Sequence, residues 1–272
     1  MKKRIVLALL LVATLCGCGK APNVSVPTET TQTVATQAPA TEDTTVETTE
    51  ALPVALEFGY EGEYLTCLNA ESMLGIDVSS FQKEIDWDKV AAAGIQFVMI
   101  RVGFRGYGEK GTLVEDKYAQ ANYAGAKKAG LKVGGYFFSQ AISKEEAIEE
   151  AEYVLQLTKD WETDMPFGFD WECHTEEYRT AGVDADTLTA CTKAFCETMT
   201  AQGQPSMIYV NPVDSPKQMH WEEISQYGLW LGQYGESLDY PQKVGMWQYT
   251  NQGKVPGIKG NVDINLYFEE AE

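Results

Sequence analysis

The order of apolar and amphipathic segments limits the fold of this chain more than any other feature. From Leu74 onward, short apolar runs alternate with stretches of helical periodicity, and Gly94 and Gly130 close two of the helical stretches. The pattern predicts strands at 74–81, 95–104, 131–139, 165–172 and 205–211, alternating with helices at 86–94, 115–130, 143–158 and 184–203. Strands that alternate with helices in this way predict a parallel sheet.

The last part of the chain contains strands without long helices between them. Apolar runs at 228–234, 244–250 and 261–268 follow the alternating region. Together with the five earlier strands they make eight, and eight strands can close a barrel. We therefore expect an α/β fold at 74–272, a TIM-like barrel of a modified (β/α)5(β)3 type whose last strands lack long helices. Residues 55–73 are expected to form a lead-in segment or an extra hairpin.

Length and charge restrict the function. A chain of 272 residues with 44% hydrophobic residues can bury one sizeable core, so one main domain is expected. The net charge is −19 at pH 7. Because binding to phosphate groups needs clustered Lys and Arg, this charge argues against a nucleic-acid partner.

The N-terminus has the features of a bacterial export signal. Lys2, Lys3 and Arg4 precede an apolar run and then small residues, so residues 1–18 are predicted to be a signal peptide. The segment ends in "LCGC", which resembles a lipobox and makes Cys18 the expected lipidated residue. The alternative is an ordinary cleaved signal with two incidental cysteines. With lipidation, the protein is expected on the outer face of the bacterial cell membrane, anchored by its N-terminal lipid.

Residues 19–54 differ in composition from the rest of the chain. The segment is rich in Thr, Pro, Ala and Glu and nearly free of large apolar side chains. Such a composition cannot compensate for the entropy lost on ordering, and we expect a disordered tether between the anchor and the barrel.

Four cysteines remain after the signal: Cys67, Cys173, Cys191 and Cys196. Buried free thiols are favoured over a disulfide, because the last two are five residues apart on a predicted helix and point in different directions. Since no Cys-x-x-Cys pair occurs and the chain has two histidines, a metal site is not expected, and neither is a cofactor.

Acidic residues fall where predicted strands end, the edge at which parallel barrels carry their chemistry. Asp77 ends the first strand, Asp170 and Glu172 end the fourth, and Asp263 lies in the last. Asp170 and Glu172 are two residues apart and share one face of their strand, about 6–7 Å apart along the backbone. Paired, partly buried carboxyls can keep one group protonated while the other is ionised, which suits cleavage of a glycosidic bond. The alternative is that these acids cap strand ends or pair with Arg101.

Aromatic side chains accompany the acids. Several lie in or near predicted strand ends, where their faces can pack against sugar rings: Tyr136, Phe138, Tyr209, Trp230, Trp247 and Tyr249. Because periodicity does not separate the barrel mouth from the core, core packing remains the alternative for about half of them.

Several of these segments together resemble a known enzyme family. The segments are "GIDVSSFQKEIDW", "FVMIRVGF", "GGYFFS", "FDWE", "IYVN" and "MWQYTNQGKVPGIKGNVDINLYF". They are similar to the family 25 glycoside hydrolases, lysozymes that cut peptidoglycan between N-acetylmuramic acid and N-acetylglucosamine. The similarity covers about 74–268, and the final segment is its most specific part.

The resemblance implies roles for individual residues. Glu172 would be the general acid, and Asp170 would be the nucleophile or the group that orients the acetamido group of the substrate. Asp77 and Asp263 would complete the carboxylate set, and Tyr136 occupies the Tyr-x-Phe position of the family. With Tyr209 and Trp247, these residues form the expected substrate-binding set. The chain departs from the family pattern at Phe137, Trp171 and Arg101.

The expected function is therefore a peptidoglycan hydrolase, an N-acetylmuramidase, acting on glycan strands as a monomer. Two other functions remain open at this stage: a surface glycan-binding lipoprotein without catalytic activity, and a chitinase-like hydrolase. The pair of mutually repelling acids favours an enzyme over a binding protein. The sequence leaves open whether Asp170 attacks the sugar directly or supports attack by the acetamido group of the substrate itself.

Overall fold

A computed structural model describes residues 55–173, 179–213 and 219–268 of the chain. The predicted signal peptide, Cys18 and the predicted tether lie outside these residues. Within the described ranges, no helix is long and apolar enough to cross a membrane.

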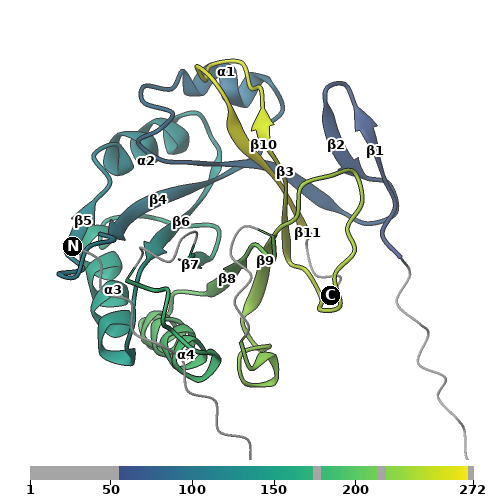
Figure 1. Cartoon of the computed structure of the whole chain (residues 1–272). Coiled ribbons are helices and arrows are strands. Elements are labelled where there is room, and N and C mark those ends of the chain that lie inside the picture. Colours follow the sequence, from purple (N-terminus) through teal and green to yellow (C-terminus); the bar gives the residue numbers. More distant parts are fainter. Residues whose placement is uncertain (1–54, 174–178, 214–218, 269–272) are drawn as a thin grey trace, which may run out of the picture. The chain divides into compact units, whose positions relative to one another are not determined.

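The described residues form a closed barrel preceded by a hairpin (Figure 1). The hairpin consists of β1 (Phe58–Glu61) and β2 (Tyr64–Cys67), paired antiparallel. The barrel strands and the helices between them are β3 (Ser72–Val78), α1 (Trp87–Ala92), β4 (Phe97–Arg105), α2 (Ala119–Lys128), β6 (Lys132–Ser139), α3 (Lys144–Leu157), β7 (Phe167–Trp171), α4 (Ala185–Ala201), β8 (Ser206–Val210), β9 (Gly228–Gly232), β10 (Met246–Gly253) and β11 (Val262–Phe268). A short strand β5 (Leu113–Glu115) pairs with β4 at its edge.

Strand pairing confirms the predicted barrel. The order is β3-β11-β10-β9-β8-β7-β6-β4, and pairing of β3 with β4 closes the ring. The strands run parallel except β11, which is antiparallel to both of its neighbours. Between β8 and β9 the only described helical segment is one short 3-10 turn, η1 (Trp221–Glu223), so the helical cover ends after α4, as the sequence predicts.

The helix ends follow the sequence signals. The Ser143 side chain caps α3 by accepting a hydrogen bond from the backbone N–H of Glu146 (3.4 Å). Gly94, Gly130 and Gly203 follow helices with φ of 89°, 83° and 76°, values that favour glycine.

The predicted start of the second helix is wrong. The helix was expected from residue 115, but α2 begins at Ala119. Asp116 is the reason: its Oδ2 accepts hydrogen bonds from the Ser80 backbone N–H (2.9 Å) and from Arg101, while its Oδ1 accepts one from the Tyr118 N–H (2.9 Å). These contacts hold the Asp116 segment in a turn against β3 and β4.

Alternation along the strands divides the core into two layers. Side chains that point into the barrel form one buried cluster: Met73, Phe97, Met99, Tyr136, Met165, Met207, Tyr209, Trp230 and Met246. The intervening positions pack outward against the helices or the hairpin, as Ile100 and Phe169 do. Three of the cysteines, Cys67, Cys191 and Cys196, are buried free thiols, in agreement with the favoured expectation, and Cys173 is partly exposed.

The hairpin occupies the side of the barrel that lacks helices (Figure 1). The Phe58 ring lies 4.7 Å from that of Trp247 on β10 and 6.3 Å from that of Phe268 on β11. The backbone N–H of Leu65 in β2 donates a hydrogen bond to the Tyr249 hydroxyl on β10 at 3.3 Å. Residues 55–73 thus cover the outer face of the last strands.

Candidate active site

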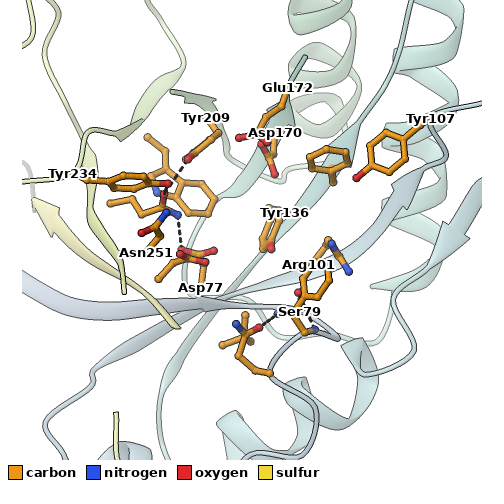
Figure 2. A pocket seen from close by; sticks show the side chains of 17 residues that line it. Asp77, Ser79, Arg101, Tyr107, Tyr136, Asp170, Glu172, Tyr209, Tyr234 and Asn251 are labelled. Atoms are coloured by element: carbon orange, nitrogen blue, oxygen red, sulfur yellow. Dashed lines mark hydrogen bonds between the residues drawn. The ribbon is translucent and has the colours of Figure 1, made fainter. Parts of the chain in front are cut away.

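Strand geometry brings the predicted acids to one end of the barrel (Figure 2). Asp77 lies near the end of β3, Asp170 near the end of β7, and Glu172 directly after β7. Asp263 lies at the start of β11, but because β11 is antiparallel, its start meets the ends of the other strands, and Asp263 pairs in register with Asp77. The four carboxyl groups therefore line one cavity.

The cavity has a volume of about 310 Å³ and a mixed polar and aromatic lining. Besides the four acids, its wall consists of Val78, Ser79, Phe81, Gln82, Arg101, Tyr107, Tyr136, Phe138, Tyr209, Trp230, Tyr234, Gln248 and Asn251. Acidic groups between aromatic faces are suited to holding a polar, ring-shaped ligand such as a sugar.

Asp77 and Asp263 form a hydrogen-bonded carboxyl pair with unequal proton affinities. Burial raises the pKa of Asp77 to about 6, although hydrogen bonds from Asn265, Gln248 and Asp263 oppose this rise. Burial and the neighbouring Asp77 raise the pKa of Asp263 to about 8. Asp263 therefore keeps its proton to higher pH than Asp77, and the hydrogen bond between the two carboxyls favours protonated Asp263 beside ionised Asp77.

Asp77 is oriented by two buried amides. Its Oδ2 accepts hydrogen bonds from Gln248 Nε2 (2.8 Å) and Asn265 Nδ2 (2.9 Å). The indole N–H of Trp230, which can only donate, binds Asn265 Oδ1 at 2.8 Å and so turns the Asn265 amide N–H groups toward Asp77.

The same network extends to two tyrosines on the cavity wall. The hydroxyls of Tyr209 and Tyr234 donate to Gln248 Oε1 at 2.9 and 3.2 Å. Both bonds turn the Gln248 amide N–H groups toward Asp77. A chain of hydrogen bonds therefore fixes Asp77 from the tyrosine side of the cavity (Figure 2).

Asp170 lies deeper in the cavity wall than Glu172. Asp170 is 8% exposed, and among the described residues its Oδ1 finds no hydrogen-bond partner, whereas Glu172 is partly exposed. Burial raises the pKa of Asp170 well above its usual range, and the neighbouring charge of Glu172 raises it further. Asp170 thus retains its proton more readily than an isolated carboxyl would.

The loop after β6 holds the main chain at Glu172. The buried Gln140 side chain donates to the Glu172 backbone carbonyl at 2.7 Å, and the indole N–H of Trp171 donates to the Ala141 carbonyl at 2.8 Å. Thr180 contacts both Gln140 Oε1 (3.3 Å) and the Glu172 carbonyl (3.5 Å). Gln140 was not among the predicted residues, because its contact is with the backbone and leaves no sequence pattern.

Among the described residues, the ion-pair partner of Arg101 is Asp116 and not Asp170 or Glu172. Its guanidinium donates to Asp116 Oδ2 from Nε (3.0 Å) and Nη2 (2.8 Å), and Nη2 also donates to Ser80 Oγ (3.1 Å). These contacts are with Asp116 and Ser80 and do not include the direct pairing with the strand-end acids that the alternative expects. Arg101 still lines the cavity, and its charge lowers the pKa of Asp170 against the larger effect of burial.

Tyr136 and Tyr209 line the cavity, but Trp247 does not. Met246 and Gln248 point into the barrel, so Trp247 between them points outward, where it is fully buried against the hairpin and donates to the Gln233 carbonyl at 2.6 Å. The prediction that Trp247 binds substrate is therefore corrected. Side chains alternate with a period of two along β10, and this alternation places Trp247 on the outer face of the barrel.

Other cavity residues were not predicted as site residues. Gln248 belongs to the same segment as Trp247. Which of the two points into the barrel depends on the register of β10 against its neighbours, and the sequence alone does not give that register. Tyr107 and Tyr234 come from segments between strands, at 48% and 43% exposure, where periodicity carries no information. Within the described part of the chain, no group of three His, Cys, Asp or Glu side chains is arranged to hold a metal ion.

Comparisons with known proteins agree with this geometry. The model of the glycosyl hydrolases family 25 matches residues 76–258. The chain is 26% identical over 200 residues to an autolytic lysozyme of Clostridium acetobutylicum, which covers 72% of this chain and 56% of that protein. It is 24% identical to lysozyme M1 of Streptomyces globisporus over 72% of this chain and 68% of that protein.

A solved structure shares the fold. The modular autolysin LytC of Streptococcus pneumoniae, determined in complex with a synthetic peptidoglycan ligand, superposes with a TM-score of 0.63 at 23% identity. The match covers 74% of this chain and 48% of LytC, so the chain spans only about half the length of these first relatives. The family match extends over most of the barrel and includes three of the four cavity acids, Asp77, Asp170 and Glu172; Asp263 lies beyond its end. The chain belongs to family 25 of the glycosyl hydrolases.

Proposed function

We propose that the protein hydrolyses the β-1,4 bond between N-acetylmuramic acid and N-acetylglucosamine in peptidoglycan. The observation that carries this proposal is the convergence of Asp170 and Glu172 with the Asp77–Asp263 pair in one aromatic-walled cavity. Family membership and the lysozymes among the relatives support it.

Glu172 is the proposed general acid because it is the more exposed member of the pair. It can reach a glycosidic oxygen in the cavity, whereas Asp170 lies at the buried position. Burial favours the protonated form of Asp170. A substrate acetamido N–H that donates to Asp170 would favour the ionised form of Asp170 before the reaction. Glu172 would then give its proton to the leaving glycosidic oxygen, while ionised Asp170 stabilises the positive charge that develops at the anomeric carbon.

Ionised Asp170 then has one of two roles. It attacks the anomeric carbon as a nucleophile, or it stabilises the acetamido group of the substrate while the acetamido oxygen attacks. Both routes need a negative charge beside the reacting carbon. The hydrogen-bonded Asp77–Asp263 pair and Tyr136 would bind the sugar around that carbon.

The test uses two isosteric variants. Glu172→Gln removes the transferable proton, and turnover of purified peptidoglycan is expected to fall by about 100-fold or more, the usual scale for general acid catalysis. Asp170→Asn should also be severely impaired, because it removes the charge that the transition state needs. Release of reducing ends, with identification of the new terminal sugar, measures both.

The outcomes separate the possible functions. New muramic acid reducing ends that depend on Glu172 support a muramidase, and cleavage confined to chitin would indicate a chitinase-like enzyme. A folded Glu172→Gln protein that releases muramic acid ends at the wild-type rate would contradict the role of Glu172. Binding to glycan strands without any cleavage would indicate a binding protein instead.

The N-terminal sequence supports a location for this activity. The protein is proposed to be a lipoprotein anchored through Cys18 on the outer face of the bacterial cell membrane, acting as a monomer on glycan strands. What supports this part of the proposal is the cationic and apolar start of the chain followed by "LCGC".

A further inference from the structure

One cation faces the acids of the cavity. Among the described residues that line it, Arg101 is the single basic side chain, opposite four carboxyl groups. It lies on β4 in register with Tyr136 of the neighbouring strand β6, at the level of the candidate catalytic groups (Figure 2). A ligand that enters this cavity with a negative charge of its own would be repelled by the ionised acids, and Arg101 is the lining group that can donate charge-assisted hydrogen bonds to it, with part of its charge already balanced by Asp116.

The Arg101 side chain is held in one orientation. Nε and Nη2 both bind Asp116, whose carboxylate is fully buried, and Nη2 also binds Ser80. The guanidinium carbon lies 5.2 Å from the Phe81 ring centre and 5.3 Å from that of Phe104. These contacts define the plane of the guanidinium before any ligand binds, which lowers the entropic cost of using it for recognition.

One edge of this fixed group stays available. Hydrogen bonds to described residues use Nε and Nη2, and they leave the N–H groups of Nη1 for a ligand. The Arg101 side chain is 11% exposed, and Phe81 beside it is 79% exposed at the cavity mouth. A partly buried guanidinium with a free N–H edge is suited to a carboxylate, because charge-assisted hydrogen bonds in such a place are strong.

The sugar chemistry identifies the carboxylate. N-acetylmuramic acid differs from N-acetylglucosamine by a lactyl ether that ends in a carboxyl group, which is charged in strands without stem peptides and forms an amide where a stem peptide is attached. Resting on the proposed function, we infer that Arg101 is a specificity-determining residue that binds the free lactyl carboxylate of N-acetylmuramic acid. The enzyme would then prefer glycan strands from which an amide-cleaving reaction has already removed the stem peptides.

The test measures binding separately from cleavage. A soluble tetrasaccharide of alternating N-acetylglucosamine and N-acetylmuramic acid with free lactyl groups is compared with the same sugar after conversion of its carboxyls to methylamides. Isothermal titration in a Glu172→Gln background avoids cleavage. The free acid should bind about tenfold tighter or more, and the difference should shrink with added salt.

Three variants in that background assign the difference to Arg101. Arg101→Gln should reduce the ratio between the two ligands to near one, mainly by weakening the free acid. Arg101→Lys, which keeps the charge without the planar donors, should retain part of the ratio. Lys193→Gln is the matched control, because it removes one positive charge from an exposed ion pair with Glu223 and should leave the ratio unchanged.

A third ligand distinguishes the lactyl carboxylate from the carboxylates of a stem peptide. The same tetrasaccharide with stem peptides on its lactyl groups should bind no better than the methylamide. Tighter binding of the peptide-bearing ligand than of the free acid would overturn the lactyl assignment, as would equal binding of acid and methylamide, or an unchanged ratio in a folded Arg101→Gln protein. If the enzyme without these changes cleaves no glycan, the proposed hydrolysis fails, while the binding ratios still decide the role of Arg101.

Discussion

The distribution of protons among the cavity acids governs the chemistry at the level of single residues. Each of Asp77, Asp170 and Asp263 has its pKa raised, in each case first by burial. Hydrogen bonds from Gln248 and Asn265 partly offset that effect at Asp77 and leave it the most readily ionised of the three. The site can therefore hold protonated and ionised carboxyls side by side, which acid catalysis of glycoside cleavage requires.

These raised values make stability depend on pH. The pKa of Asp77 rises from 3.8 to about 6 and that of Asp263 from 3.8 to about 8. Between about pH 4 and pH 8 these two carboxyls therefore hold more protons in the folded protein than in the unfolded chain. The free energy of unfolding should fall as pH rises through this window, because deprotonation costs more in the folded state.

Asp263→Asn tests this dependence. A neutral amide at this position removes the carboxyl with the higher pKa of the pair, so the fall in melting temperature between pH 5 and pH 8 should become smaller than in the wild type. Thermal denaturation at several pH values measures it. Asp160→Asn is the control, because the Asp160 side chain is 87% exposed and does not line the cavity, and it should keep the wild-type slope. A wild-type slope in Asp263→Asn would contradict the assignment.

At the level of elements, the hairpin replaces helices that the barrel lacks. α2, α3 and α4 pack on β4, β6, β7 and β8, and the hairpin packs on the outer face of β10 and β11. Without it, the outward-facing Trp247, which is fully buried, would lose part of its cover. Because Gln248 on the same strand orients Asp77, the hairpin supports the strand that carries part of the site.

Phe58→Ala should destabilise the barrel through this contact. Phe58 is partly buried against Trp247 and Phe268, and loss of its ring should lower the free energy of unfolding by about 1–2 kcal/mol, from the usual value of burying such a side chain. Urea denaturation measures the change. Tyr60→Ala on the same strand is the control, since Tyr60 is 60% exposed and its removal should cost about 0.5 kcal/mol or less. Equal losses in both variants would mean that the hairpin does not cover the barrel.

For the whole molecule, the proposed anchor is separate from the proposed catalytic site. The predicted lipidation site is residue 18, whereas the first residue in sequence that lines the cavity is Asp77. Cys18→Ala should therefore move the protein from the membrane to the soluble fraction of exported protein, because it removes the thiol that would be lipidated. The purified domain from Leu52 onward, which lacks residue 18 altogether, should remain active.

Membrane fractionation of cells that express the two forms measures this prediction. Cys16→Ala is the matched control, because it removes the neighbouring thiol and leaves the predicted lipidation site in place. An unchanged distribution of Cys18→Ala would show that the anchor assignment is wrong. It would leave the assignment of the cavity acids untouched.

Much of the fold follows from local sequence signals. Strand and helix periods, the Ser143 cap and the glycines after helices identify the barrel because each depends on neighbouring residues. The placement of Asp77, Asp170 and Glu172 at one edge follows as well, since parallel strands end at the same side of a barrel. The N-terminal predictions rest on the same kind of local signal and remain predictions.

Tertiary structure alone decided how these groups act together. The antiparallel direction of β11 pairs Asp263 with Asp77, and the register of β10 turns Gln248 inward and Trp247 outward. Arg101 pairs with Asp116, which lies 15 residues away on a turn that the sequence suggested was helical. Strand direction, register and burial depend on contacts between segments distant in the chain, and those contacts set the proton affinities and partners that one sequence segment does not contain.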